Sequence, residues 1–79
     1  MKIYLIRTCD NKDRYYTLEI VPTLFSDFLL IIEYGAVNNN KPTGVVKKYF
    51  SIYMKAMDEL NSTLNKKLKK GYRNKRQGN

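Results

Sequence analysis

The first fifty positions contain one long apolar run and three shorter alternating segments, separated by polar turns, which is the pattern of β-strands. The longest apolar stretch, Phe28 to Val37, predicts a central strand, because it is rich in β-branched and aromatic residues and too short for a helix that buries itself. The three alternating segments, Lys2 to Thr8, Arg14 to Val21 and Val45 to Phe50, predict three further strands. Their mostly short connections favour antiparallel pairing.

After Phe50 the apolar residues recur at spacings of three and four, which predicts one amphipathic helix. Its apolar stripe consists of Tyr53, Ala56, Met57, Leu60, Leu64 and Leu68. Ser51 is the expected N-cap, Gly71 is placed to end the helix in the left-handed conformation, and Tyr72 is expected to fold back near Leu68. The whole pattern predicts an α+β fold, in which a four-stranded, mostly antiparallel sheet is followed by one C-terminal helix packed on one face.

The length of 79 residues allows one small domain. We expect it to span residues 1–72 and to be followed by a disordered basic tail, residues 73–79, which has nothing apolar to bury. The single cysteine, Cys9, excludes an internal disulfide, and no segment is long enough to span a bilayer. The first apolar run is too short for a signal peptide, so we expect a cytoplasmic protein without a membrane partner.

Charge is the most informative bulk property, because fifteen Lys and Arg against seven Asp and Glu give a net charge of +8. The last fourteen residues contain seven cations and no acid: Lys66, Lys67, Lys69, Lys70, Arg73, Lys75 and Arg76. Such a cluster favours a partner rich in phosphate. The alternative is a solvated helix end and tail that keep the protein soluble.

The sequence lacks the residues that enzyme active sites usually contain. The chain has no histidine, no second cysteine, and no Ser, Thr or Lys with a recognisable base at motif spacing. The four glycines match neither a P-loop nor a dinucleotide fingerprint. We therefore expect a protein that is not an enzyme and that needs no cofactor, metal ion or small-molecule substrate.

One helix covers only one face of a sheet, so the other face is expected to expose several of Tyr4, Tyr15, Lys47 and Tyr49. Tyrosines interleaved with lysines on an open sheet are typical of proteins that stack the bases of single-stranded nucleic acids. Tyrosine is also simply a good strand residue. Both interpretations remain open at this point.

Three motifs carry a resemblance to the WGR domain family, and the likeness covers almost the whole chain, up to and including Tyr72. The central strand ends in Tyr34-Gly35-Ala36, Lys48 and Phe50 follow at the family's distances, and Lys70-Gly71-Tyr72 closes the helix. The family is named for a Trp-Gly-Arg at the end of its central strand. Tyr34 stands where the family has tryptophan, Gly35 matches, and Ala36 replaces the arginine.

The resemblance implies a nucleic-acid-binding module, with DNA as the expected partner, RNA as an open alternative and strand ends as a candidate target. In DNA-break-dependent poly(ADP-ribose) polymerases the family's tryptophan packs on the sugar of a 5′-terminal nucleotide, and the arginine contacts DNA and neighbouring domains. The expected nucleic-acid-binding residues are Tyr34, Gly35, Lys48, Lys66, Lys67, Lys69, Lys70 and Arg73. Lysines near the helix end are expected to make up the charge missing at Ala36.

Two alternatives share the predicted topology. Single-stranded DNA-binding proteins of the positive cofactor type also have four antiparallel strands and a C-terminal helix, and they act as homodimers; this is a fold-level analogy. The chain is also consistent with a protein-interaction or regulatory module that docks a partner on its open sheet face or edge, with the basic tail serving solubility.

Overall fold

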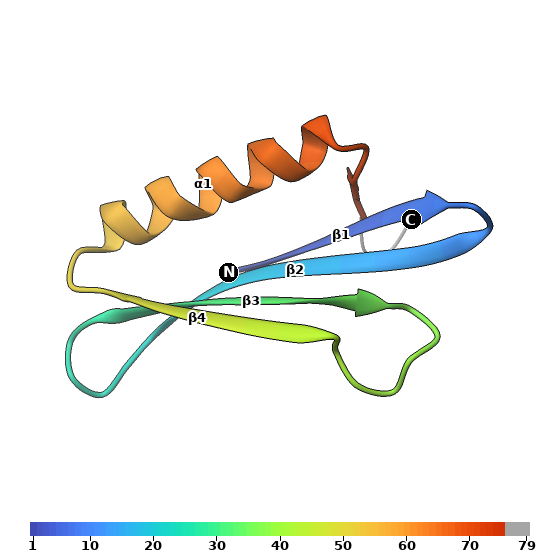
Figure 1. The fold of residues 1–79 in the computed structure, drawn as a ribbon. Coiled ribbons are helices and arrows are strands. Elements are labelled where there is room, and N and C mark those ends of the chain that lie inside the picture. Colours follow the sequence, from blue (N-terminus) through green and yellow to red (C-terminus); the bar gives the residue numbers. More distant parts are fainter. Residues whose placement is uncertain (76–79) are drawn as a thin grey trace.

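The computed structural model describes residues 1–75 as an antiparallel sheet and one helix (Figure 1). The elements are β1 (Lys2–Cys9), β2 (Lys12–Pro22), β3 (Phe28–Ala36), β4 (Gly44–Phe50), α1 (Tyr53–Lys69) and β5 (Arg73–Asn74). The order across the sheet is β4-β3-β2-β1-β5, and every neighbouring pair is antiparallel. The predicted α+β fold, with four main strands and one C-terminal helix, is confirmed.

The register of the sheet follows from its tight connections. Asp10 and Asn11 join β1 to β2 with φ angles of 55° and 64°, a conformation that two-residue hairpins require and that Asn and Asp tolerate. The turn aligns Leu5 with Tyr16, and the β2–β3 pairing then aligns Tyr16 with Tyr34. Because directly paired residues point to the same face, these three side chains share the helix side of the sheet.

The hydrophobic core lies between that face and α1, which crosses it as Figure 1 shows. Its fully enclosed members are Leu5, Leu18, Ile20, Leu30, Ile32, Ala56 and Leu60. The run that begins at Phe28 supplies Leu30 and Ile32 to this core, and β3 has a neighbouring strand on each side, as predicted for a central strand. The predicted apolar stripe of α1 is buried in its middle, but Tyr53 and Leu68 near its ends remain 43% and 44% exposed.

The start of α1 differs from the prediction. The N-cap is Ile52 instead of Ser51, and no side chain caps the helix. Ile52 has extended backbone angles, and its carbonyl accepts hydrogen bonds from the amides of Lys55 (3.1 Å) and Ala56 (3.3 Å). Ser51 thus lies one residue too early for its hydroxyl to reach the free amides of the first turn.

The end of α1 confirms the predicted stop at Gly71, which has a φ of 101°. The amide of Gly71 donates to the Leu68 carbonyl (3.1 Å), and the amide of Tyr72 donates to the Lys67 carbonyl (3.1 Å). These two bonds form a Schellman motif. Tyr72 does turn back, but its ring meets Tyr16 on β2, with centroids 5.8 Å apart.

Residues 73–75, which the sequence analysis assigned to a disordered tail, are instead paired with the sheet. Arg73 and Asn74 form β5, which pairs with Ile6 and Leu5 of β1, and the Lys75 amide extends this pairing to the Tyr4 carbonyl at 2.8 Å. The outer edge of β1 offers unpaired backbone groups, and the turn at Gly71 brings the chain beside them. The remainder of the predicted tail, residues 76–79, lies outside the described residues. Within the described part, no helix is long and apolar enough to cross a membrane.

Candidate nucleic-acid interface

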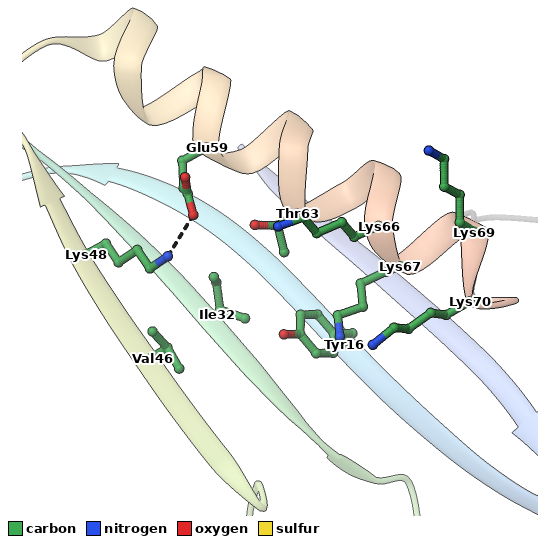
Figure 2. A pocket seen from close by; sticks show the side chains of 10 residues that line it. All are labelled: Tyr16, Ile32, Val46, Lys48, Glu59, Thr63, Lys66, Lys67, Lys69 and Lys70. Carbon is green, nitrogen blue, oxygen red and sulfur yellow. Dashed lines mark hydrogen bonds and ion pairs between the residues drawn. The ribbon is translucent and has the colours of Figure 1, made fainter.

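A groove of about 470 Å³ runs between the C-terminal half of α1 and the sheet (Figure 2). It is lined by Tyr16, Ile32, Val46, Lys48, Glu59, Thr63, Lys66, Lys67, Lys69 and Lys70. Lysines supply five of the ten lining residues, and Glu59 is the one acid among them. The groove therefore combines a small apolar floor with a strongly cationic rim, which suits a ligand with both a planar or apolar part and negative charge.

Tyr16 forms the aromatic centre of this groove, and three side chains surround its ring. The Lys67 ammonium nitrogen lies over the ring, 4.4 Å from the centroid. Tyr34 stacks beside it, with centroids 5.5 Å apart and planes 14° from parallel, while Tyr72 meets it edge-on. Such cation–π and aromatic contacts hold the rings in fixed positions beside the lysines.

Tyr34 lies beside the groove because of strand register on both of its sides. It pairs with Tyr16 on β2 and with Gly44 on β4. A side chain at position 44 would collide with the Tyr34 ring, since an added methyl carbon would lie 2.9 Å from Cε1 and closer still to Cζ and the hydroxyl. Gly44 thus provides the space in which the Tyr34 ring lies, 36% exposed, on the same surface as the lysine cluster.

Lys48 enters the groove from β4 and is paired. Its Nζ lies 2.7 Å from Oε2 of Glu59 on α1, an ion pair visible in Figure 2, and both side chains are partly exposed. Pairs of this kind contribute about 0–1 kcal/mol to stability. Their larger effect here is on charge, because Glu59 partly neutralises the cation at this end of the groove.

The pKa values of two groove residues are shifted by their surroundings. Burial, followed by repulsion from Lys70 and Lys66, lowers the pKa of Lys67. Burial, followed by the neighbouring phenols of Tyr34 and Tyr72, raises the pKa of Tyr16, against a smaller opposing effect of Lys48. Close-packed like charges on the rim are therefore unfavourable in the free protein, and an anion placed among them would relieve that repulsion.

Six of the eight residues expected from the sequence gather at this groove. Five of them, Lys48, Lys66, Lys67, Lys69 and Lys70, line it directly, and Tyr34 adjoins it through Tyr16.

Gly35 and Arg73 lie elsewhere. Gly35 is buried, and its missing side chain makes room for the amide of Thr43 and the ring of Tyr15 on the opposite face. Arg73, on β5, pairs with Ile6, whose side also faces away from α1.

Sequence reasoning missed Tyr16 and two arginines. Tyr16 is one of several residues on the helix side of β2, and nothing in the local sequence distinguishes it from Leu18. Arg14 pairs with Ala36 on one side and with Arg7 on the other, so both arginines lie on the helix side of the sheet, in the row next to Tyr34. Arg14 therefore places a positive charge opposite Ala36, which has no charge of its own.

Within residues 1–75, no three His, Cys, Asp or Glu side chains are close enough together to hold a metal ion. The described chain is instead a small α+β domain with a basic, tyrosine-floored groove between its helix and sheet.

The sequence matches the WGR domain family over residues 1–79, so the chain belongs to that family. WGR domains are, in general, domains of a nucleic-acid-binding type. No curated protein and no solved structure matches the chain.

Proposed function

We propose that this domain is a non-enzymatic DNA-binding module that holds phosphates in the groove beneath the end of α1. The supporting observation is that Tyr16 lies in the groove with the lysines of the helix end and stacks on the Tyr34 ring, which adjoins the groove. Lys66, Lys67 and Lys70 present their ammonium groups to the backbone of the strand, and Lys69, which points away from the sheet in Figure 2, adds charge at the rim. Binding therefore depends strongly on salt and little on sequence.

Tyr34 supplies a contact of a different kind. Its ring is partly exposed at the groove, beside Tyr16, where it can meet the sugar or base of a nucleotide whose phosphate lies on the lysines. Internal nucleotides of a duplex keep their bases stacked on both sides, whereas a terminal nucleotide offers a free face. This geometry favours strand ends over closed duplex.

Arg7 and Arg14 extend the cationic surface beyond the groove. They occupy adjacent positions on β1 and β2, and the Arg7 guanidinium lies 5.9 Å from the centroid of the Tyr72 ring. A strand that leaves the groove past Tyr72 would meet them next. They provide at this edge the positive charge that Ala36 lacks.

The test is a titration of labelled DNA at several salt concentrations, using a blunt duplex, a closed circle and a single strand. The variant Lys66→Gln/Lys70→Gln should lower the slope of log affinity against log salt by about 1.8 on duplex DNA, because each phosphate contact contributes roughly 0.9. The matched control is Lys41→Gln/Lys55→Gln, which removes the same charge from exposed positions outside the groove lining. Its slope should not change.

Two results would reject the proposal. One is equally weak binding to all three DNA forms at low salt. The other is an identical salt slope for the groove variant and its control, which would mean that affinity follows net charge alone. Strand-end recognition is tested separately with the variant Tyr34→Val. This variant should weaken binding to the blunt duplex and leave binding to the closed circle unchanged.

A protein-interaction role is a second candidate, supported by the loop between β2 and β3. Leu24 and Phe25 are 98% and 87% exposed there, on a turn closed by hydrogen bonds between Thr23 and Asp27. The Phe25 amide also donates to the Thr23 hydroxyl at 3.1 Å. Ordered turns that expose adjacent large apolar side chains are typical of contact surfaces. Leu24→Ser/Phe25→Ser should then abolish binding of a protein partner without affecting DNA affinity.

A further inference from the structure

The face of the sheet opposite α1 carries a second aromatic and cationic cluster, which we call the tyrosine face: Tyr4, Tyr15, Arg73 and Lys75. Tyr4 and Tyr15 stack with ring centroids 5.9 Å apart and planes 18° from parallel. The Lys75 ammonium nitrogen lies 5.3 Å from the centroid of the Tyr4 ring. Arg73 belongs to the same face, because it pairs with Ile6, the neighbour of Tyr4 on that side of β1.

The backbone arranges this cluster from three separate segments. Tyr4 lies on β1 and Tyr15 on β2, and the pairing of Ile6 with Tyr15 places the two rings diagonally across the strands. The short strand β5 adds Arg73 to the edge, and Lys75 follows directly after it, with its amide donating a hydrogen bond to the Tyr4 carbonyl. Gly35 completes the arrangement, since a methyl group there would lie 3.3 Å from Cε1 of Tyr15. The ring of Tyr15 thus lies over bare backbone.

No other described element covers this face. The helix packs against β2, β3 and β4 from the opposite side, and the whole of α1 lies on that side in Figure 1. Tyr4 and Tyr15 are each partly exposed. The cluster therefore presents aromatic rings and two cations to solvent, at a site separated from the groove by the thickness of the sheet.

We propose that the tyrosine face is a second binding site, specific for single-stranded nucleic acid, whose bases stack on Tyr4 and Tyr15 while Arg73 and Lys75 neutralise the phosphates. The charge favours a polyanion over an ordinary protein segment, because both cations lie at the β1–β5 edge, whereas the acids of this face, Asp13, Glu19 and Glu33, lie on β2 and β3. Stacking excludes intact duplex, whose bases have no free aromatic face. A strand held here would be on the opposite side of the sheet from one held in the groove.

Photocrosslinking of a short oligonucleotide that carries 5-iodouracil tests the contact directly, without disturbing the fold. The wild-type chain is irradiated in complex with the oligonucleotide, and the crosslinked tyrosine is identified by mass spectrometry. We expect crosslinks at Tyr4 or Tyr15. Crosslinks found only at Tyr16, Tyr34 or Tyr72 would overturn the proposal. A complete absence of crosslinks would also overturn it and would indicate that the tyrosine face contacts a protein partner.

Affinity measurements separate this site from the groove. In the Lys66→Gln/Lys70→Gln background, Tyr4→Val/Tyr15→Val should weaken binding to oligothymidylate about ten-fold or more, whereas Tyr4→Phe/Tyr15→Phe, which keeps both rings, should not. Valine preserves strand propensity, and the unfolding transition of each variant reports whether the sheet survives.

The two proposals fail in different ways. Unchanged oligothymidylate affinity in a folded valine variant would overturn the tyrosine face alone. Identical salt slopes for the groove variant and the Lys41→Gln/Lys55→Gln control would reject the groove and leave crosslinks at Tyr4 or Tyr15 unaffected.

Discussion

The substitution Gly44→Ala should displace the Tyr34 ring, because the space above Gly44 is the space that this ring occupies. The new methyl carbon would lie 2.9 Å from Cε1 of Tyr34 and closer to Cζ and the hydroxyl, whereas ordinary carbon contacts lie near 3.5–4.0 Å. Backbone strain is not expected, since Gly44 is not among the glycines with positive φ. The flexible end of Tyr34 must therefore move.

The magnitude follows from the contacts that the moving ring gives up. Loss of the stack on Tyr16, at 5.5 Å and 14°, costs about 0.5–1.5 kcal/mol. A strained rotamer adds about 0.5–1.5 kcal/mol, and replacing a strand glycine by alanine returns about 0.5–1 kcal/mol. The net loss in the free energy of unfolding should be about 1 kcal/mol, which lowers the Tm of so small a domain by roughly 4–8 °C.

The assay is a double-mutant cycle with Tyr34→Val, measured by urea unfolding. In the Tyr34→Val background no ring meets the added methyl group, so Gly44→Ala should be neutral or slightly stabilising, and the coupling energy should exceed about 1 kcal/mol. If Gly44→Ala costs the same in both backgrounds, within about 0.5 kcal/mol, the ring does not depend on this glycine and the reasoning is wrong. Gly44→Ala should also weaken binding to DNA ends as much as Tyr34→Val does.

Two further predictions concern charge in the groove. Burial raises the pKa of Tyr16, so the folded chain holds the phenol proton more tightly than the unfolded chain does. This difference contributes to the free energy of unfolding below pH 10, and the contribution is lost as the pH rises past that value. Urea unfolding from about pH 9 to about pH 11 should therefore show a smaller loss for Tyr16→Phe than for wild type; equal losses would contradict the assignment. Glu59→Gln should change stability by less than about 1 kcal/mol but tighten DNA binding a few-fold at low salt, because it frees Lys48 and removes the acid from the groove. Asp58→Asn is the charge-matched control on the exposed side of α1, and an equal gain for both variants would show that net charge alone is responsible.

Local pattern was sufficient to predict the four main strands and the helix. Alternation, and for β3 one long apolar run, defined these strands within one or two residues, and spacings of three and four defined α1. The end of α1 at Gly71 was also predictable from the sequence, because the left-handed conformation that follows many helices strongly favours glycine. Each of these features depends on residues close together in the chain.

Features that depend on two distant segments were predicted poorly. Ser51 failed as a cap because the backbone path from β4, not the hydroxyl, determines where α1 begins. Arg73 and Asn74 looked like tail because their order comes from the free edge of β1, about seventy positions earlier in the sequence. An apolar count cannot detect a strand that is held only by backbone hydrogen bonds.

The candidate site divides in the same way. The sequence by itself determined that cations cluster at the end of α1 and that an aromatic residue, Tyr34, ends the central strand beside a glycine. Only the tertiary structure decided that Tyr16 lies in one groove with the lysines, that Tyr34 stacks on Tyr16 beside this groove, and that Arg14 lies across from Ala36. The reason is strand register, which turns and side-chain packing fix across the sheet. Composition specifies which groups a chain carries, but register decides which of them meet.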